Sequence, residues 1–159
     1  MATSQAAASH SRTMAPPDPG YAARVRASFD RQGAMRLIGA RLTELRPGYC
    51  TIELPYRDDL TQQHGYIHAG IVSAIADSAG GYAGFTLFPA DASVLTVEYK
   101  MNLLAPAAGE RLIAVGEVVK RGRTLAITRG EVYAVDGGRR TLCAIMQQTL
   151  IVMAGKLDE

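Results

Sequence analysis

Residues 60–90 form a stretch with almost no formal charge, and this stretch constrains the fold more than any other feature of the chain. Asp77 is its only residue with a formal charge at neutral pH. From Ala69 to about Leu87 the side chains are apolar or small nearly all round, which predicts a helix that is buried on every side. Because an ionised carboxylate in apolar surroundings costs several kcal/mol unless it is paired or hydrogen-bonded, we expect Asp77 to have a use.

Segments with the alternation of β-strands surround this predicted helix. Residues 41–55 alternate on both sides of Pro47-Gly48, as a hairpin does, and further strand-like runs follow at regular spacing: 93–104, 111–120, 124–134 and 141–153. Short connections predict antiparallel pairing between consecutive strands. One apolar helix and about six strands are buried most simply when a curved antiparallel sheet wraps around the helix, which is an α+β architecture.

The length of 159 residues, with 48% hydrophobic and 20% charged side chains, fits one globular domain. We expect residues 1–20, which are rich in small residues, serine and proline, to form a disordered tail. Residues 21–159 are then expected to form a single domain that begins with a short surface helix at 21–35. The N-terminus lacks the apolar core that an export signal needs, which predicts a cytoplasmic protein.

Composition and motifs argue against several partners. The net charge of +2 is too small to indicate a nucleic-acid surface. A carboxylate in the middle of the apolar run argues against a membrane span. Dinucleotide and phosphate-binding motifs are absent, so no cofactor is expected. His64, His68 and Asp77 are metal ligands by type, but Gly65 and Gly70 disfavour a helix across both histidines, so no metal site is expected.

Several spaced elements resemble one known family. The run His68-Ala69-Gly70, Asp77 nine residues after His68, and the sequence TVEYKMNLLAPA at 96–107 are similar to the hotdog-fold acyl-CoA thioesterases of the phenylacetate-pathway, PaaI-like type. The resemblance covers about residues 33–153. It implies a hotdog fold, an acyl-CoA substrate, and hydrolysis of the thioester with Asp77 as nucleophile or general base.

The same resemblance implies roles for four more positions. The backbone N–H of Ala69 would polarise the thioester carbonyl, and His68 would shape the loop around it. Gln62 matches a position near the thioester, and Thr96 matches one whose hydroxyl helps to hold the attacking water. Ala69 departs from the pattern, which usually has glycine there; alanine can serve if its φ is negative.

Elementary chemistry agrees with these roles and adds a constraint. The N-terminus of a buried helix supplies oriented N–H groups for charge that develops on a thioester oxygen, and Asp77 is the carboxylate in reach of that chemistry. Nine residues make about 2.5 turns, which places Asp77 roughly 13 Å along the helix from His68 and on the opposite side. Two antiparallel copies can bring both to one carbonyl, which predicts a homodimer, or a dimer of dimers, with shared sites.

Three glycines are candidate substrate contacts. Gly70 belongs to the helix-start run. Gly80 and Gly81 follow Asp77 by three and four residues, so they lie on its helical face, where they leave space for an acyl chain or for close helix–sheet packing.

Two other functions remain open on this sequence. A hotdog hydratase or dehydratase would need His68 and Asp77 to converge on Cα and Cβ of an acyl thioester, but the proline-bearing loop typical after its histidine is absent. A non-catalytic acyl-CoA binder would have no reason to bury a carboxylate beside the thioester. The acyl group, whether aromatic, medium-chain or long-chain, is not indicated.

Overall fold

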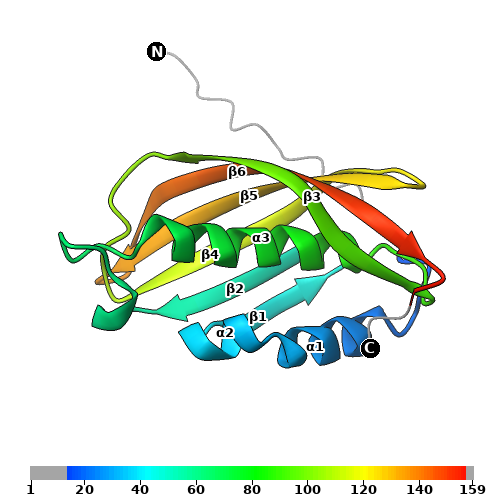
Figure 1. Ribbon diagram of the computed structural model, residues 1–159, viewed down its shortest axis with the longest axis horizontal. Coiled ribbons are helices and arrows are strands. Elements are labelled where there is room, and N and C mark those ends of the chain that lie inside the picture. The colour runs from blue at the N-terminus through cyan, green and yellow to red at the C-terminus, as the bar shows by residue number, and fades with distance from the viewer. Residues whose placement is uncertain (1–13, 157–159) are drawn as a thin grey trace, which may run out of the picture.

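The computed structural model describes residues 14–156, and within them a six-stranded antiparallel sheet curves around one long helix (Figure 1). The helices are α1 (Tyr21–Arg31), α2 (Gly33–Ile38) and α3 (Ala69–Phe85), with a short 3-10 helix, η1, at Asp58–Leu60. The strands are β1 (Arg41–Arg46), β2 (Tyr49–Pro55), β3 (Ala92–Leu103), β4 (Arg111–Arg121), β5 (Leu125–Asp136) and β6 (Arg139–Ala154). The predicted α+β architecture, with about six strands wrapped around a buried helix, is confirmed.

Helix α3 lies against the concave face of the sheet because its side chains are small or apolar on every side. Ile75, Ala79 and Ala83 are fully buried there. On β4, a Cβ added at Gly116 would lie 2.2 Å from the carbonyl oxygen of Ala79. The helix and the sheet therefore approach more closely than any side chain larger than hydrogen allows at that position.

The order of the strands differs from the simple pairing of consecutive strands. The hairpins β1–β2, β4–β5 and β5–β6 form, but β3 pairs with β6 and β4 pairs with β2, giving the order β1-β2-β4-β5-β6-β3. The prediction is therefore wrong for β3 and β4. Helix α3 carries the chain from β2 to the far edge of the sheet, and the return segment contains Pro106, which has no N–H for a hairpin ladder.

This order gives the sheet two unlike edges. At the β3 edge, Leu95, Val97 and Tyr99 are 56%, 57% and 45% exposed. At the β1 edge, the exposed residues include Arg41 and Glu44. The β3 edge therefore exposes large apolar side chains alongside the charged Glu98 and Lys100, whereas β1 exposes no large apolar side chain.

The predicted surface helix at 21–35, expected to end near Gly33, is α1, which ends at Arg31, and a second helix, α2, follows it. Gln32, between α1 and α2, has φ −68° and ψ 101°, which is extended backbone and interrupts the helix. Helix α1 packs on α3, where the rings of Phe29 and Tyr82 meet edge to face at 5.7 Å. Of the tail predicted at 1–20, residues 1–13 lie outside the described residues. Asp18 accepts hydrogen bonds from Gly20 N and Arg24 Nε at 2.7 and 2.9 Å.

Candidate active site

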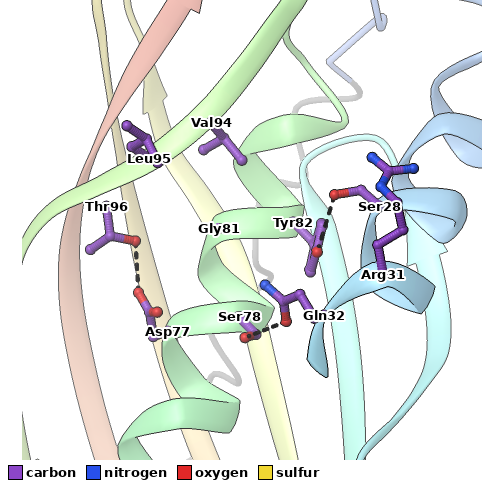
Figure 2. Close-up of a pocket in the computed structure, with 10 residues that line it drawn as sticks. All are labelled: Ser28, Arg31, Gln32, Asp77, Ser78, Gly81, Tyr82, Val94, Leu95 and Thr96. Carbon is purple, nitrogen blue, oxygen red and sulfur yellow. Dashed lines mark hydrogen bonds between the residues drawn. The ribbon is translucent and has the colours of Figure 1, made fainter. Parts of the chain in front are cut away.

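Asp77 lies in the middle of α3 at the wall of a cavity of about 400 Å³ (Figure 2). Helix α1 closes one side of this cavity and the start of β3 closes another. The residues that line it are Ser28, Arg31, Gln32, Asp77, Ser78, Gly81, Tyr82, Val94, Leu95 and Thr96. Asp77 is partly buried, so one side of its carboxylate faces the protein and the other can meet a ligand.

One oxygen of the Asp77 carboxylate receives two hydrogen bonds. Thr96 Oγ1 donates to Asp77 Oδ1 at 2.7 Å (Figure 2), and Gln148 Nε2 donates to the same oxygen at 2.5 Å. No donor to Oδ2 is recorded among residues 14–156. The structure thus brings together Asp77 and Thr96, as the resemblance implied, and adds Gln148 to them.

The start of α3 carries a backbone donor without a partner. His68 is the N-cap residue, with φ −59° and ψ 139°, and its Nδ1 accepts a hydrogen bond from Gly70 N at 2.9 Å. Within the described part of the chain no acceptor is recorded for the N–H of Ala69. No described residue other than glycine has a positive φ. The φ of Ala69 is therefore negative, which is the condition under which alanine can replace the glycine of the family pattern. This N–H lies at the positive end of the helix dipole.

Gln62 lies beside Ala69 in a second, smaller cavity of about 150 Å³. Cys143 also lines it. The side-chain oxygen of Gln62 accepts a hydrogen bond from the backbone N–H of His64. The cavities at Asp77 and at Ala69 have no lining residue in common. Eight residues of helix separate Asp77 from Ala69, or about 12 Å, so one chain presents two separate half-sites.

The three candidate glycines have different surroundings. Gly81 lines the cavity beside Asp77, and a Cβ there would meet no atom within 4 Å. Gly80 faces the sheet instead, where a Cβ would lie 2.2 Å from Gln148 Oε1. Gly70 lies under the ring of His68.

The site contains residues that the sequence reasoning missed. Gln148 occupies a position on β6 between Met146 and Leu150, two residues from each, which is the buried phase of the alternation. An amide in that phase signals a buried polar group that needs partners. Ser28 comes from α1 and Gln32 directly follows α1, and both precede the part of the chain covered by the resemblance. Gln32 Oε1 accepts a hydrogen bond from Ser78 Oγ at 3.3 Å (Figure 2).

Other chemistry finds little support within residues 14–156. No three histidine, cysteine, aspartate or glutamate side chains gather there as metal ligands would. None of the described helices combines the length and the apolar character that crossing a membrane requires. Burial raises the pKa of the Cys50 thiol to about 12 and also raises the pKa of Cys143, so neither thiol is an activated nucleophile.

Comparisons with known proteins agree with the fold. A family model described as the thioesterase superfamily matches residues 64–141. A crystal structure of a thioesterase family protein from Silicibacter pomeroyi is 50% identical, covers 86% of this chain and 100% of its own, and superposes with a TM-score of 0.84. A protein of Halobacterium salinarum, named as an esterase by inference, is 31% identical over 67% of this chain and 73% of its own length.

Two more distant proteins are also similar. The 1,4-dihydroxy-2-naphthoyl-CoA hydrolase of Listeria monocytogenes is 22% identical over 70% of this chain and 89% of its own length. The PaaI protein from the phenylacetic acid degradation operon of E. coli shares the fold, with a TM-score of 0.76 at 17% identity over 86% of this chain and 95% of its own. The predicted family is confirmed: the chain belongs to the thioesterase superfamily and has the hotdog fold.

Proposed function

We propose that this chain hydrolyses an acyl-CoA thioester to the free acid and CoA, with Asp77 as nucleophile or general base. The observation that carries the proposal is the carboxylate of Asp77, held at a cavity wall by hydrogen bonds to one oxygen only. The name of the Listeria monocytogenes relative, a CoA-thioester hydrolase, supports CoA as the thiol part of the substrate.

In the proposed reaction the thioester carbonyl lies between the two half-sites. The N–H of Ala69 donates to the carbonyl oxygen and stabilises the negative charge that develops on it. Asp77 Oδ2 either attacks the carbonyl carbon or takes a proton from a water that attacks it. The carbon–sulfur bond then breaks and CoA leaves as a thiolate, which takes up a proton. When a water attacks, this step gives the free acid directly; when Asp77 attacks, the acyl group stays on Asp77 as a mixed anhydride, which a water then hydrolyses to the free acid and the original carboxylate.

Thr96 supports either route. Its hydroxyl proton goes to Asp77 Oδ1, and one of its lone pairs accepts from Gln148 Nε2 at 3.0 Å. A hydroxyl oxygen has a second lone pair, so Thr96 can still accept a hydrogen bond from the attacking water.

We propose further that two copies of the chain pair to complete each site. The apolar side chains of Leu95, Val97 and Tyr99 at the β3 edge support this pairing, because an exposed apolar edge strand is a template for another strand. A two-fold axis across this edge would bring the Asp77 half-site of one copy toward the Ala69 half-site of the other. A dimer of dimers would preserve the same arrangement.

The role of His68 favours hydrolysis over hydration or dehydration. Its Nδ1 accepts the N–H of Gly70, so the ring caps α3. A hydratase needs a histidine that is free to exchange a proton with the carbon chain of the substrate. Here Nδ1 is the acceptor of the capping bond, so the neutral ring carries its proton on Nε2 and cannot accept a proton from the substrate there.

The proposal is tested by incubating the full chain with a panel of acyl-CoA thioesters of varied length and aromaticity and measuring the released thiol and acid. Asp77→Asn should remain folded and lose at least about a thousandfold in kcat on the best substrate, since it keeps the shape and removes the base or nucleophile. Asp91→Asn, at an exposed aspartate outside the site, is the matched control and should be unaffected.

Three outcomes count against parts of the proposal. If wild-type protein leaves every thioester in the panel intact, hydrolysis is not its function. If the acyl chain gains or loses water while the thioester persists, the protein is a hydratase or dehydratase. If Asp77→Asn keeps the wild-type kcat, Asp77 is not the reacting group.

A further inference from the structure

Gln148 is a buried amide whose two ends are both hydrogen-bonded. Its side chain lies on the inner face of β6 and is 1% exposed. Its Oε1 accepts from Thr128 Oγ1 on β5 at 2.7 Å. Its Nε2 donates to Asp77 Oδ1 at 2.5 Å and to Thr96 Oγ1 at 3.0 Å. The amide therefore connects the sheet to the one carboxylate of α3.

The partners of this amide fix its orientation. An ionised carboxylate only accepts hydrogen bonds, so the NH₂ end must face Asp77 and the carbonyl end must face Thr128. In the reverse orientation Oε1 would lie against Asp77 Oδ1, with no proton between the two oxygens. The hydroxyl of Thr128 is fully buried, and the amide oxygen is the acceptor that it has within the described residues.

Gly80 provides the space that this arrangement needs. A Cβ at Gly80 would lie 2.2 Å from Gln148 Oε1 and 2.9 Å from Thr128 Oγ1. Any other residue would push the amide away from Asp77. Glycine is destabilising in the middle of a helix. Its presence one turn after Asp77 is explained by the Gln148 amide, which packs against the helix backbone at that position.

We propose that Gln148, anchored by Thr128, is the positioning residue of the site. With Thr96 it binds Asp77 Oδ1, fixes the plane of the carboxylate, and leaves Oδ2 as the oxygen that reacts. The inference rests on the proposed hydrolysis for its kinetic consequences. Its structural content, two donors on one carboxylate oxygen, can be measured without turnover.

Two substitutions at Gln148 test the proposal. Gln148→Met keeps the length and removes the donors; kcat should fall about 10- to 100-fold with KM changed less than about twofold. Gln148→Glu keeps the shape but places a second carboxyl group against Asp77, so kcat should fall at least as far.

The matched controls are the same substitutions at Gln147. This residue is the neighbour of Gln148 on β6, and its side chain is exposed. Gln147→Met and Gln147→Glu should keep the wild-type kcat and KM. Equal effects at Gln147 and Gln148 would overturn the proposal, because they would come from the strand and not from the amide.

A second variant covers the case in which Gln148→Met does not fold, since that change leaves the Thr128 hydroxyl without an acceptor. The double variant Gln148→Met with Thr128→Val removes both polar partners and retains an apolar fit. It should fold and still show the low kcat with little change in KM. A folded double variant with the wild-type kcat would overturn the positioning role.

The chemical shift of the Asp77 carboxyl carbon, measured by NMR in the full chain at one pH, reports the hydrogen bonds on the carboxylate and separates this inference from the proposed function. If wild-type protein hydrolyses no thioester, the proposed function fails, while a larger change of this shift in Gln148→Met than in Gln147→Met still supports the positioning. If wild-type protein is active and the two variants have the same chemical shift and kcat, the positioning fails and the function stands.

Discussion

At the residue scale, the hydroxyl of Thr96 occupies a position where it both donates to Asp77 and accepts from Gln148. We expect Thr96→Val to fold, since valine suits a strand, and to lower kcat about 10- to 100-fold through the loss of one or two hydrogen bonds in the transition state. The control is Thr149→Val on β6, where the hydroxyl bonds Glu98 away from the cavity. Equal kinetics of the two variants would assign Thr96 a role in the strand alone.

The two cysteines give a second prediction at this scale. Burial raises the pKa of Cys50 to about 12 and raises that of Cys143, so both thiols stay protonated below these values, at any ordinary assay pH. Native protein should therefore not react with a thiol reagent such as DTNB, whereas protein in guanidinium should show two thiols per chain, the number in the sequence. A fast-reacting thiol in native protein would contradict this and would also disturb the thiol-release assay.

At the element scale, the sequence predicted the helices and hairpins that depend only on residues close together in the chain. The buried helix α3 and the hairpin around Pro47-Gly48 follow from local periodicity and turn residues. The pairing of β3 with β6 does not, because it depends on α3 crossing the sheet, so that β3 begins at the far edge beside β6. Gln148 shows the same limit within the site: alternation places it inside, but only the assembled sheet shows that it meets Asp77.

Gly80 and Gly81 form a matched pair on α3. Gly80→Ala should lower the free energy of unfolding by about 1–3 kcal/mol, since the new methyl group overlaps Gln148, and should lower kcat as the amide moves. Gly81→Ala meets open space and should raise the free energy of unfolding by about 0.4–1 kcal/mol. Urea denaturation of both variants measures this. Equal midpoints would mean that the amide does not need the space at Gly80.

At the scale of the whole molecule, the separation of the half-sites predicts that activity belongs to the dimer. Asp77→Asn and Ala69→Pro should each be inactive alone. Proline suits the first position of a helix, and ψ 139° at His68 suits a residue before proline, so Ala69→Pro removes the N–H and retains the fold. Mixed dimers carry one intact site and one doubly altered site, and should recover about half of the wild-type activity per dimer.

Different affinity tags on the two variants allow the mixed dimers to be purified and assayed directly. Inactive mixed dimers of proven composition would mean that the donor and the carboxylate come from the same chain. This shared-site arrangement is the part of the site that helix geometry predicted before any contact was known, since about 12 Å of helix separates Ala69 from Asp77.

The unlike edges of the sheet determine how far association can proceed. The proposed pairing through β3 would use the edge with the large exposed apolar side chains and would leave the two β1 edges at the ends of the joined sheet. Exposed charges such as Arg41 and Glu44 oppose the addition of a further strand. The proposed assembly would therefore end at that stage, and a chain whose β1 carried valine and threonine at those positions would be free to grow into an open-ended fibre.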